Sequence, residues 1–261
     1  MYDFAALERA LAGTIFAGKL HFSVLTGSTN SDAVAAARAG APHGSVFFTD
    51  EQTAGRGRGD HAWHSAAGQG LYVSVILRLP VASARLPLLP LAAGLAAADA
   101  IRAASGLTVD LRWPNDLLIG QRKTGGILVE TQTDSGGLAF AVAGIGINVH
   151  QQQFARGLAT PATSLDLESG RWIDRQPLLF ALLESLEHEA RALAEPGANT
   201  AVPARVARAS TWVRGRQVEV HGPQACVGTT EGLDEHGFLL VRTSTGLVQV
   251  QTGGIRAAEA N

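Results

Sequence analysis

The chain has 261 residues, of which 46% are apolar and 17% are charged, and its formal net charge is −2. This composition excludes an intrinsically disordered protein, and the small net charge disfavours a general nucleic-acid coat. The single cysteine, Cys226, excludes an internal disulfide and a cysteine-based metal cluster. We therefore expect a folded cytoplasmic protein of one large domain or a large and a small one, with no membrane anchor.

The first predicted elements are a helix, a strand and a second helix. Asp3 can cap a helix over residues 3–12, and residues 20–25 alternate as a strand. Ser28, Thr29 and Asn30 then stand where the chain turns into an alanine-rich helix that ends at Gly40. Such a corner collects hydroxyl groups, an amide and free helix N–H groups, so it suits a small polar ligand or plain capping of the helix.

A short strand over residues 44–49 leads into a glycine-arginine segment, residues 53–63. Its glycines alternate with Arg56 and Arg58, so the segment has no apolar period and is costly to order. Glycine N–H groups and guanidinium groups both bind phosphate, and Trp63 can stack on a base. The pattern predicts either a loop that an anionic ligand orders or a solvated basic loop followed by a core tryptophan.

The middle of the chain predicts further strands of the same sheet. Residues 71–79 alternate with a period of two, which predicts a strand with one strongly apolar face beside the preceding strand. Residues 86–104 predict a buried helix that covers this sheet. The next strand begins at residue 109 and ends at Pro114, which cannot donate to a ladder, so Asn115 and Asp116 are displayed at its end.

Two more strands follow, over residues 127–131 and 139–149. The second contains Gly144 and Gly146. Glycines inside a strand indicate close approach of a ligand or of other backbone, or else a bulge or a tight contact between helix and sheet.

The last third of the chain predicts helices and then a small β domain. Apolar spacing predicts an amphipathic helix over residues 177–193, with a second helix possible up to Arg208. After Trp212 the chain predicts short strands over residues 218–220, 226–233, 238–242 and 247–251. We therefore divide the chain into a catalytic domain over residues 1–209 and a C-terminal antiparallel barrel over residues 210–261.

Five of these motifs occur in the order in which the biotin protein ligase family has them. They are Ser28-Thr29-Asn30; Gln52-Thr53-Ala54-Gly55-Arg56-Gly57-Arg58 with Trp63; Arg112-Trp113-Pro114-Asn115-Asp116; Arg122-Lys123-Thr124-Gly125-Gly126-Ile127-Leu128-Val129-Glu130; and Gly144-Ile145-Gly146-Ile147-Asn148. The chain resembles this family over residues 20–150 and more loosely at its C-terminus. The resemblance implies an α+β fold, with a mixed β-sheet flanked by helices as in class II aminoacyl-tRNA synthetases and an SH3-like C-terminal barrel.

The resemblance also implies a reaction in two steps. Biotin and ATP give biotinyl-5′-adenylate and pyrophosphate, and a lysine of a biotin carboxyl carrier protein then takes the biotinyl group. Because a carboxylate approaches a phosphate, the site needs cations, and Lys123, Arg56 and Arg58 are the candidates for catalysis. Asp116 is the candidate ligand for Mg²⁺, and a purely structural role in which Asp116 caps the turn has equal weight.

The remaining candidate residues would bind the substrates. Ser28, Thr29 and Gln52 would bind the ureido head of biotin. Arg56, Gly57 and Arg58 would close over its tail and the phosphate, with Trp63 as a stacking lid. Asn115 and Asn148 would contact the adenylate. The remaining candidates, Asn30, Gly55, Gly125 and Gly144, belong to the same motifs.

Two departures from the family pattern and two rival functions accompany this interpretation. The family loop often continues with further arginines, whereas this chain has Gly59-Asp60-His61, which predicts a weaker grip on phosphate. The chain begins almost directly at the catalytic domain, which predicts a monofunctional ligase that binds neither DNA nor membrane; a homodimer is left open.

The rival functions are those of a lipoate or octanoyl ligase and of a non-catalytic biotin sensor. The C-terminal barrel carries none of the ligand motifs, so we expect it to matter less for biotin binding than for transfer to the carrier.

Overall fold

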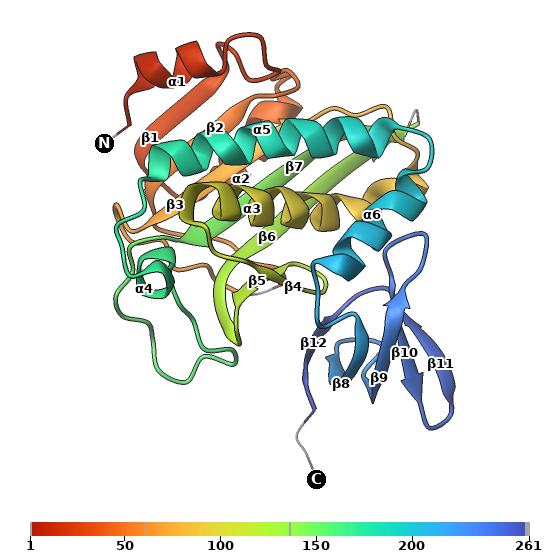
Figure 1. Cartoon of the computed structure of the whole chain (residues 1–261). Helices are drawn as coiled ribbons and strands as arrows, with labels where there is room; N and C mark the ends of the chain where they lie inside the picture. Colours follow the sequence, from red (N-terminus) through yellow and green to blue (C-terminus); the bar gives the residue numbers. More distant parts are fainter. Residues whose placement is uncertain (1, 60, 136, 259–261) are drawn as a thin grey trace.

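The catalytic part of the molecule is built on a seven-stranded mixed sheet, seen here in a computed structural model that describes residues 2–59, 61–135 and 137–258. Its strands are β1 (Leu20–Thr26), β2 (Val46–Gln52), β3 (Gly70–Leu77), β4 (Asp110–Arg112), β5 (Asp116–Ile119), β6 (Arg122–Asp134) and β7 (Gly137–Asn148). They lie in the order β1-β2-β3-β7-β6-β5-β4 (Figure 1). The pair β1 and β2 is parallel, and the pairs that follow across the sheet are antiparallel.

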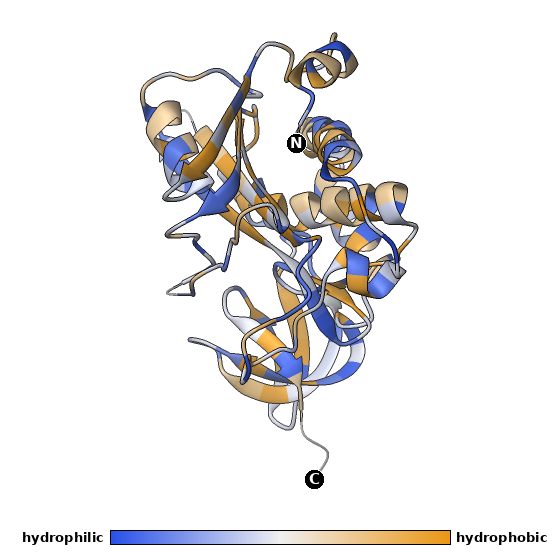
Figure 2. Cartoon of the chain, turned by 90° about the vertical axis from the view of Figure 1, so that its left-hand side faces the viewer, coloured by the Kyte–Doolittle hydropathy of each residue, from blue (hydrophilic) through white to orange (hydrophobic). Residues whose placement is uncertain are grey.

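Helices cover both faces of this sheet. They are α1 (Phe4–Ala10), α2 (Thr29–Arg38), a 3₁₀ turn (Ser83–Leu88), α3 (Leu89–Ser105), α4 (Leu165–Ser169), α5 (Arg175–Ala194) and α6 (Ala198–Arg208). Helices α3 and α5 pack together over one face, and α2 packs against β2, β3 and β7. In Figure 2 the hydrophobic segments of the central strands lie between these layers. The α3 and α5 side holds the main core, while Ile76 and Val142 belong to a smaller core under α2.

Strand β3 shows why the layers matter. The apolar face predicted from the sequence packs into the main core through Leu71, Val73, Val75 and Leu77. The opposite face is buried as well, because helices on both sides exclude water from both faces of the central strands.

The most apolar helical segment, Ser83–Ser105, belongs to the core. It is long and apolar enough to cross a membrane, but 61% of its apolar window is buried inside the protein. Gly106 ends the helix in the left-handed conformation, with φ of 77° and its N–H bonded to the carbonyl of Arg102. The predicted buried helix over the sheet is confirmed.

A five-stranded antiparallel sheet forms the C-terminal part. Its strands are β8 (Arg214–His221), β9 (Cys226–Leu233), β10 (Leu239–Thr243), β11 (Gly246–Val250) and β12 (Gly254–Ala257), in the order β11-β10-β9-β8-β12. The sequence analysis missed β12, which is only four residues long. The sheet is joined to the catalytic part: Trp113 Nε1 donates to the carbonyl of Gly237 at 3.0 Å, and buried residues of both parts form one continuous core.

Candidate functional site

A cavity of about 840 Å³ opens beside the N-terminus of α2. Among the residues predicted from sequence, it is lined by Ser28, Thr29, Asn30, Gln52, Arg56, Gly57, Arg58, Trp63, Asn115, Asp116, Lys123, Gly144 and Asn148. These residues come from five separate stretches of the chain, so the fold brings the five motifs to one place.

The floor of the cavity is made of strands that carry glycine where side chains would block it. A Cβ atom on Gly144 would lie 2.0 Å from Asn30 Oδ1, and one on Gly146 would lie 2.6 Å from the Trp63 ring. The ladder is regular here, since Gly144 and Gly146 pair in register with Ser74 and Tyr72. The structure therefore supports close approach rather than a bulge as the reason for these glycines.

Two predicted glycines lie outside the cavity lining. A Cβ atom on Gly55 would lie 2.3 Å from the carbonyl oxygen of Trp63, so this glycine lets the base of the loop close tightly. A Cβ atom on Gly125 would lie 2.8 Å from Leu117 Cδ1, on the core side of the sheet. Its neighbour Gly126 is the residue that lines the cavity.

The corner between β1 and α2 presents an unused hydroxyl group. Ser28 precedes α2 in an extended conformation, but its side chain makes no capping bond. Thr29 donates both its backbone N–H and its hydroxyl to Gln52 Oε1, at 2.9 and 3.2 Å. Within the described ranges Ser28 Oγ has no hydrogen-bond partner, although the residue is only 3% exposed. The corner is therefore suited to a polar ligand group.

Behind this corner the polar groups are already paired with one another. Ser74 Oγ lies 2.8 Å from Thr29 Oγ1 and 2.7 Å from Asn30 Oδ1. Asn30 Nδ2 donates to Glu130 Oε2 at 2.8 Å. The amide of Asn30 thus supports the corner from within the protein.

A buried carboxylate stands between two cations at the other end of the cavity. Asp116 Oδ1 lies 2.5 Å from Lys123 Nζ, and Asp116 Oδ2 lies 2.5 Å from a terminal nitrogen of Arg112. Burial raises the pKa of Asp116, but Lys123 and Arg112 together hold it below the ordinary carboxyl value. Lys123 Nζ also lies 5.5 Å from the Trp63 ring centroid. The carboxylate fixes the ammonium group of Lys123 at the cavity.

These contacts bear on the predicted Mg²⁺ site. Both oxygens of Asp116 already face cations. The described part of the chain holds no group of three or more His, Cys, Asp or Glu residues placed to bind a metal ion. The geometry therefore favours Asp116 as a partner of Lys123 over Asp116 as a metal ligand.

The two arginines of the loop reach in different directions. Arg56 donates to both carboxylate oxygens of Glu130, at 2.7 and 3.1 Å. Arg58 donates to Thr252 Oγ1 at 2.9 Å and to the carbonyl of Gly253. Burial lowers the pKa of Arg58, and the charge of Asp116 opposes this shift.

The loop also has contacts of its own. Gly57 N–H donates to the carbonyl of His61 at 2.7 Å, and Trp63 N–H donates to that of Gly55 at 2.8 Å. Asp60, part of the departure from the family pattern, lies outside the described residues. Ordering of the loop by a ligand stays a prediction.

Each of the two predicted adenylate contacts is held by a neighbouring strand or loop. Asn115 Nδ2 donates to the carbonyl of Ile127 at 2.9 Å. Asn148 Nδ2 donates to the carbonyl of Thr163 at 3.0 Å, and Asn148 Oδ1 accepts from Gln151 Nε2 at 3.3 Å. Their side chains line the cavity in fixed orientations.

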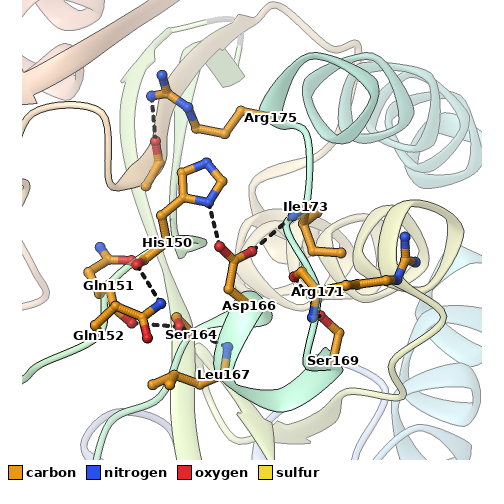
Figure 3. A network of polar contacts seen from close by, with 11 residues as sticks. His150, Gln151, Gln152, Ser164, Asp166, Leu167, Ser169, Arg171, Ile173 and Arg175 are labelled. Atoms are coloured by element: carbon orange, nitrogen blue, oxygen red, sulfur yellow. Dashed lines mark hydrogen bonds and ion pairs between the residues drawn. The ribbon is translucent and has the colours of Figure 1, made fainter.

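One wall of the cavity was not predicted from sequence. It follows β7 and includes Gln151, and Figure 3 shows how it is held. His150 Nδ1 lies 2.8 Å from Asp166 Oδ2, and the His150 ring stacks on Trp172 with centroids 3.5 Å apart. Ser164 Oγ donates to the carbonyl of Gln151 at 2.7 Å. No single motif marks this wall, because its contacts join short polar segments without a period.

The C-terminal sheet forms another wall. His221, Thr252, Gly253 and Arg256 all line the cavity. This sheet carries none of the ligand motifs predicted from the sequence, yet it lies beside the cavity. The signal available in the sequence was Gly253, where a Cβ atom would lie 2.1 Å from the carbonyl oxygen of His221, so two parts of this wall approach each other closely.

The arrangement brings a buried polar corner, two cationic side chains and an aromatic ring into one cavity. Lys123 and Arg58 provide positive charge, and Ser28 and Gln52 provide polar groups for an uncharged head. Such a cavity can align a carboxylate with a phosphate and shield the product from water.

Known proteins share this architecture and sequence. Residues 22–148 match the model of the biotin/lipoate A/B protein ligase family, and residues 214–255 match that of the biotin protein ligase C-terminal domain. The biotin–[acetyl-CoA-carboxylase] ligase of Mycobacterium tuberculosis is 35% identical over 237 residues, covering 88% of this chain and 85% of that protein. The bifunctional ligase/repressor BirA of Bacillus subtilis is 35% identical over 236 residues, covering 87% of this chain and 70% of that protein.

Solved structures give the same picture. The biotin protein ligase of Aquifex aeolicus in complex with biotin and ATP superposes with a TM-score of 0.78 at 26% identity, covering 92% of this chain and 98% of that chain. Its R40G mutant with biotin gives a TM-score of 0.80, also at 26% identity, covering 92% and 99%.

Proposed function

Because the chain belongs to the biotin protein ligase family, we propose that its cavity forms biotinyl-5′-adenylate from biotin and ATP and passes the biotinyl group to a carrier lysine. The ligase activity follows from the family, and the observation that carries the mechanism is the placement of Lys123 by Asp116 beside the glycine-arginine loop. The two steps use one cavity.

In the first step a biotin carboxylate oxygen attacks the α-phosphorus of ATP. The new phosphorus–oxygen bond forms as the bond to the pyrophosphate oxygen breaks, and pyrophosphate leaves. Lys123 would neutralise charge shared by the carboxylate and the α-phosphate, and Arg58 would hold the phosphate from the opposite side. The ion pair with Asp116 holds the ammonium group of Lys123 in place.

In the second step the carrier's lysine amine attacks the acyl carbon of the mixed anhydride. An amide bond forms, AMP leaves, and the amine gives up its proton. The enclosed cavity would protect the anhydride from hydrolysis until the carrier arrives.

The polar corner would bind the head of biotin. Its ureido N–H groups need acceptors and its carbonyl needs donors, and Ser28, Thr29 and Gln52 supply both. Arg56 and Gly57 would close over the tail. Trp63, Asn115 and Asn148 would surround the adenylate.

Magnesium ions would enter with ATP. Mg²⁺ needs only one or two protein carboxylates when phosphate oxygens and waters supply its other ligands. Asp116 is the carboxylate predicted from the sequence to bind Mg²⁺, but its pairing with Lys123 and Arg112 argues against a direct bond to the metal ion. We propose no step that depends on a protein-bound metal ion.

The acceptor would be the biotin carboxyl carrier of acetyl-CoA carboxylase, in the cytoplasm. The support is the similarity to the biotin–[acetyl-CoA-carboxylase] ligase of Mycobacterium tuberculosis, which this chain covers over most of its length.

The test is biotin-dependent exchange of pyrophosphate into ATP, followed by transfer to a purified carrier domain. Exchange with biotin, and none with lipoate or octanoate, would support the proposal. Exchange that depends on lipoate would establish the rival ligase. Tight biotin binding without exchange would establish a non-catalytic sensor.

A further inference from the structure

Glu130 lies on β6 and does not line the cavity, yet it contacts both the loop and the polar corner. Its two carboxylate oxygens accept three hydrogen bonds. Arg56 donates two of them, at 2.7 and 3.1 Å, and Asn30 donates the third, at 2.8 Å. We propose that Glu130 is a positioning residue that anchors the glycine-arginine loop to the biotin corner, a role that rests on the proposed function.

The contact has the geometry of a specific anchor. An isolated ion pair at the surface contributes little, but a bidentate arginine–carboxylate pair fixes distance and direction together. Here the side chain of Glu130 is 29% exposed, and the bond from Asn30 holds the carboxylate from the protein side. The guanidinium of Arg56 thus meets a fixed acceptor.

The loop needs such an anchor because of its composition. Glycines at positions 55, 57 and 59 give the backbone many conformations, so closing the loop over a ligand costs entropy. A side chain already tied to β6 removes part of that cost before the ligand arrives. Arg56 then acts by fixing the loop, while Arg58 is the arginine that faces the charge of Asp116.

The other end of the anchor is the polar corner. Asn30 contacts Ser74, Ser74 contacts Thr29, and Thr29 binds Gln52. These contacts connect the residues proposed to bind the biotin head with the loop proposed to cover its tail. Glu130 joins the two ends, so it should affect retention of biotin and its adenylate more than the chemical step.

The test compares Glu130→Gln with the wild type, with Glu231→Gln as a matched control. Glu231 forms a bidentate pair with Arg242 in the C-terminal sheet, at 2.8 and 3.0 Å, and does not line the cavity. In Glu130→Gln we expect about tenfold faster dissociation of biotinyl-adenylate, the size expected from loss of one hydrogen bond to a charged group. The KM for biotin should rise and kcat should change less, and Glu130→Asp should restore part of the loss.

The pathway through Arg56 is tested with a double mutant. If Glu130 acts through Arg56, the change Glu130→Gln should have little effect in an Arg56→Gln background. Additive effects of the two changes, or unchanged adenylate dissociation in Glu130→Gln, would overturn the proposal. Should Glu130→Gln fail to fold, Arg56→Gln alone must give the faster dissociation.

A readout without biotin separates this proposal from the function itself. Limited trypsin digestion of the protein alone should cut after Arg58 faster in Glu130→Gln than in the wild type or in Glu231→Gln. Equal cutting in all three would count against the anchor even if the ligase activity is present. Absence of adenylate formation in the wild type would reject the function and leave the digestion result to stand by itself.

Discussion

The floor of the cavity and the loop that covers it are both rich in glycine, but different contacts hold them in place. In the floor, Gly144 and Gly146 sit in a regular ladder between buried strands, where missing side chains make room for Asn30 and Trp63. In the loop, Gly55 and Gly57 let the two halves of the loop approach each other, and Arg56 and Arg58 tie the loop to β6 and to the C-terminal sheet. A floor shaped by packing is formed before a ligand binds, whereas a loop held by a few polar contacts can open and close.

The largest effect should come from removing the ammonium group that Asp116 holds at the cavity. We expect Lys123→Ala to lower the rate of adenylate formation by about a hundredfold or more, because one preorganised charge is lost from the transition state. The fold should remain, since Lys123 is partly exposed and pairs mainly with Asp116. Pyrophosphate exchange and thermal unfolding measure the two effects. A folded mutant with the wild-type rate would show that another group supplies the charge.

A methyl group added to the floor of the cavity should lower adenylate affinity more than a methyl group added at a nearby position with open space around it. Gly146→Ala would place Cβ 2.6 Å from the Trp63 ring, so the ring or the strand must move, at a cost of about 1–3 kcal/mol. We expect adenylate affinity to fall at least tenfold, as measured by calorimetry. Gly27→Ala is the control, because its Cβ would meet nothing within 4 Å. Equal effects of both changes would contradict a shaped floor.

Removing the contact between the loop and the C-terminal sheet should make the loop more mobile and leave the floor of the cavity intact. Arg58→Gly removes the bonds to Thr252 and Gly253 and one of the cations proposed to hold the phosphate. We expect biotinyl-adenylate to escape about tenfold faster, from loss of hydrogen bonds to a charged group, and to label lysines indiscriminately. Adenylate release and labelling of a bystander protein measure this. If the rate of adenylate release is unchanged, the contact between Arg58 and the C-terminal sheet does not help to retain the adenylate.

The loop should also respond to substrates while the floor does not. Trypsin should cut after Arg56 or Arg58 in the protein alone, and biotin with ATP should suppress this cutting several-fold, because ordering of the loop removes the extended conformation that the protease needs. If cutting is equally fast with saturating substrates, or if the loop resists trypsin without them, the loop does not close in this way.

The smallest effect should appear as a dependence of stability on acid. The pKa of Asp116 is held below its unfolded value by Lys123 and Arg112, so its contribution to stability is present above about pH 4 and is lost as pH falls. The difference in unfolding free energy between wild type and Asp116→Asn should therefore shrink between pH 6 and pH 3. Denaturant unfolding at several pH values measures it, and a constant difference would mean that the carboxylate is not stabilised by its partners.

Most of the helices and strands and part of the site could be predicted from the sequence. Helical and strand periods predicted most of the elements in their order, and five ordered motifs predicted the family and one side of the cavity, but not the wall after β7 or the wall from the C-terminal sheet. The elements missed are β5, β12 and α4, which are four, four and five residues long and too short to show a period. For β3 the sequence predicted the strongly apolar face, but burial of the other face depends on helix layers that lie far away in the chain.

Which groups face one another depends on the packing of distant parts of the chain. Arg56 and Arg58 have the same chemistry and stand two residues apart, yet one meets Glu130 from β6 and the other meets Thr252 from the C-terminal sheet. Asp116 pairs with Lys123 because a hairpin brings β5 beside β6. Local sequence sets the conformations available to a segment, but contacts between residues up to 195 positions apart depend on how the sheets pack.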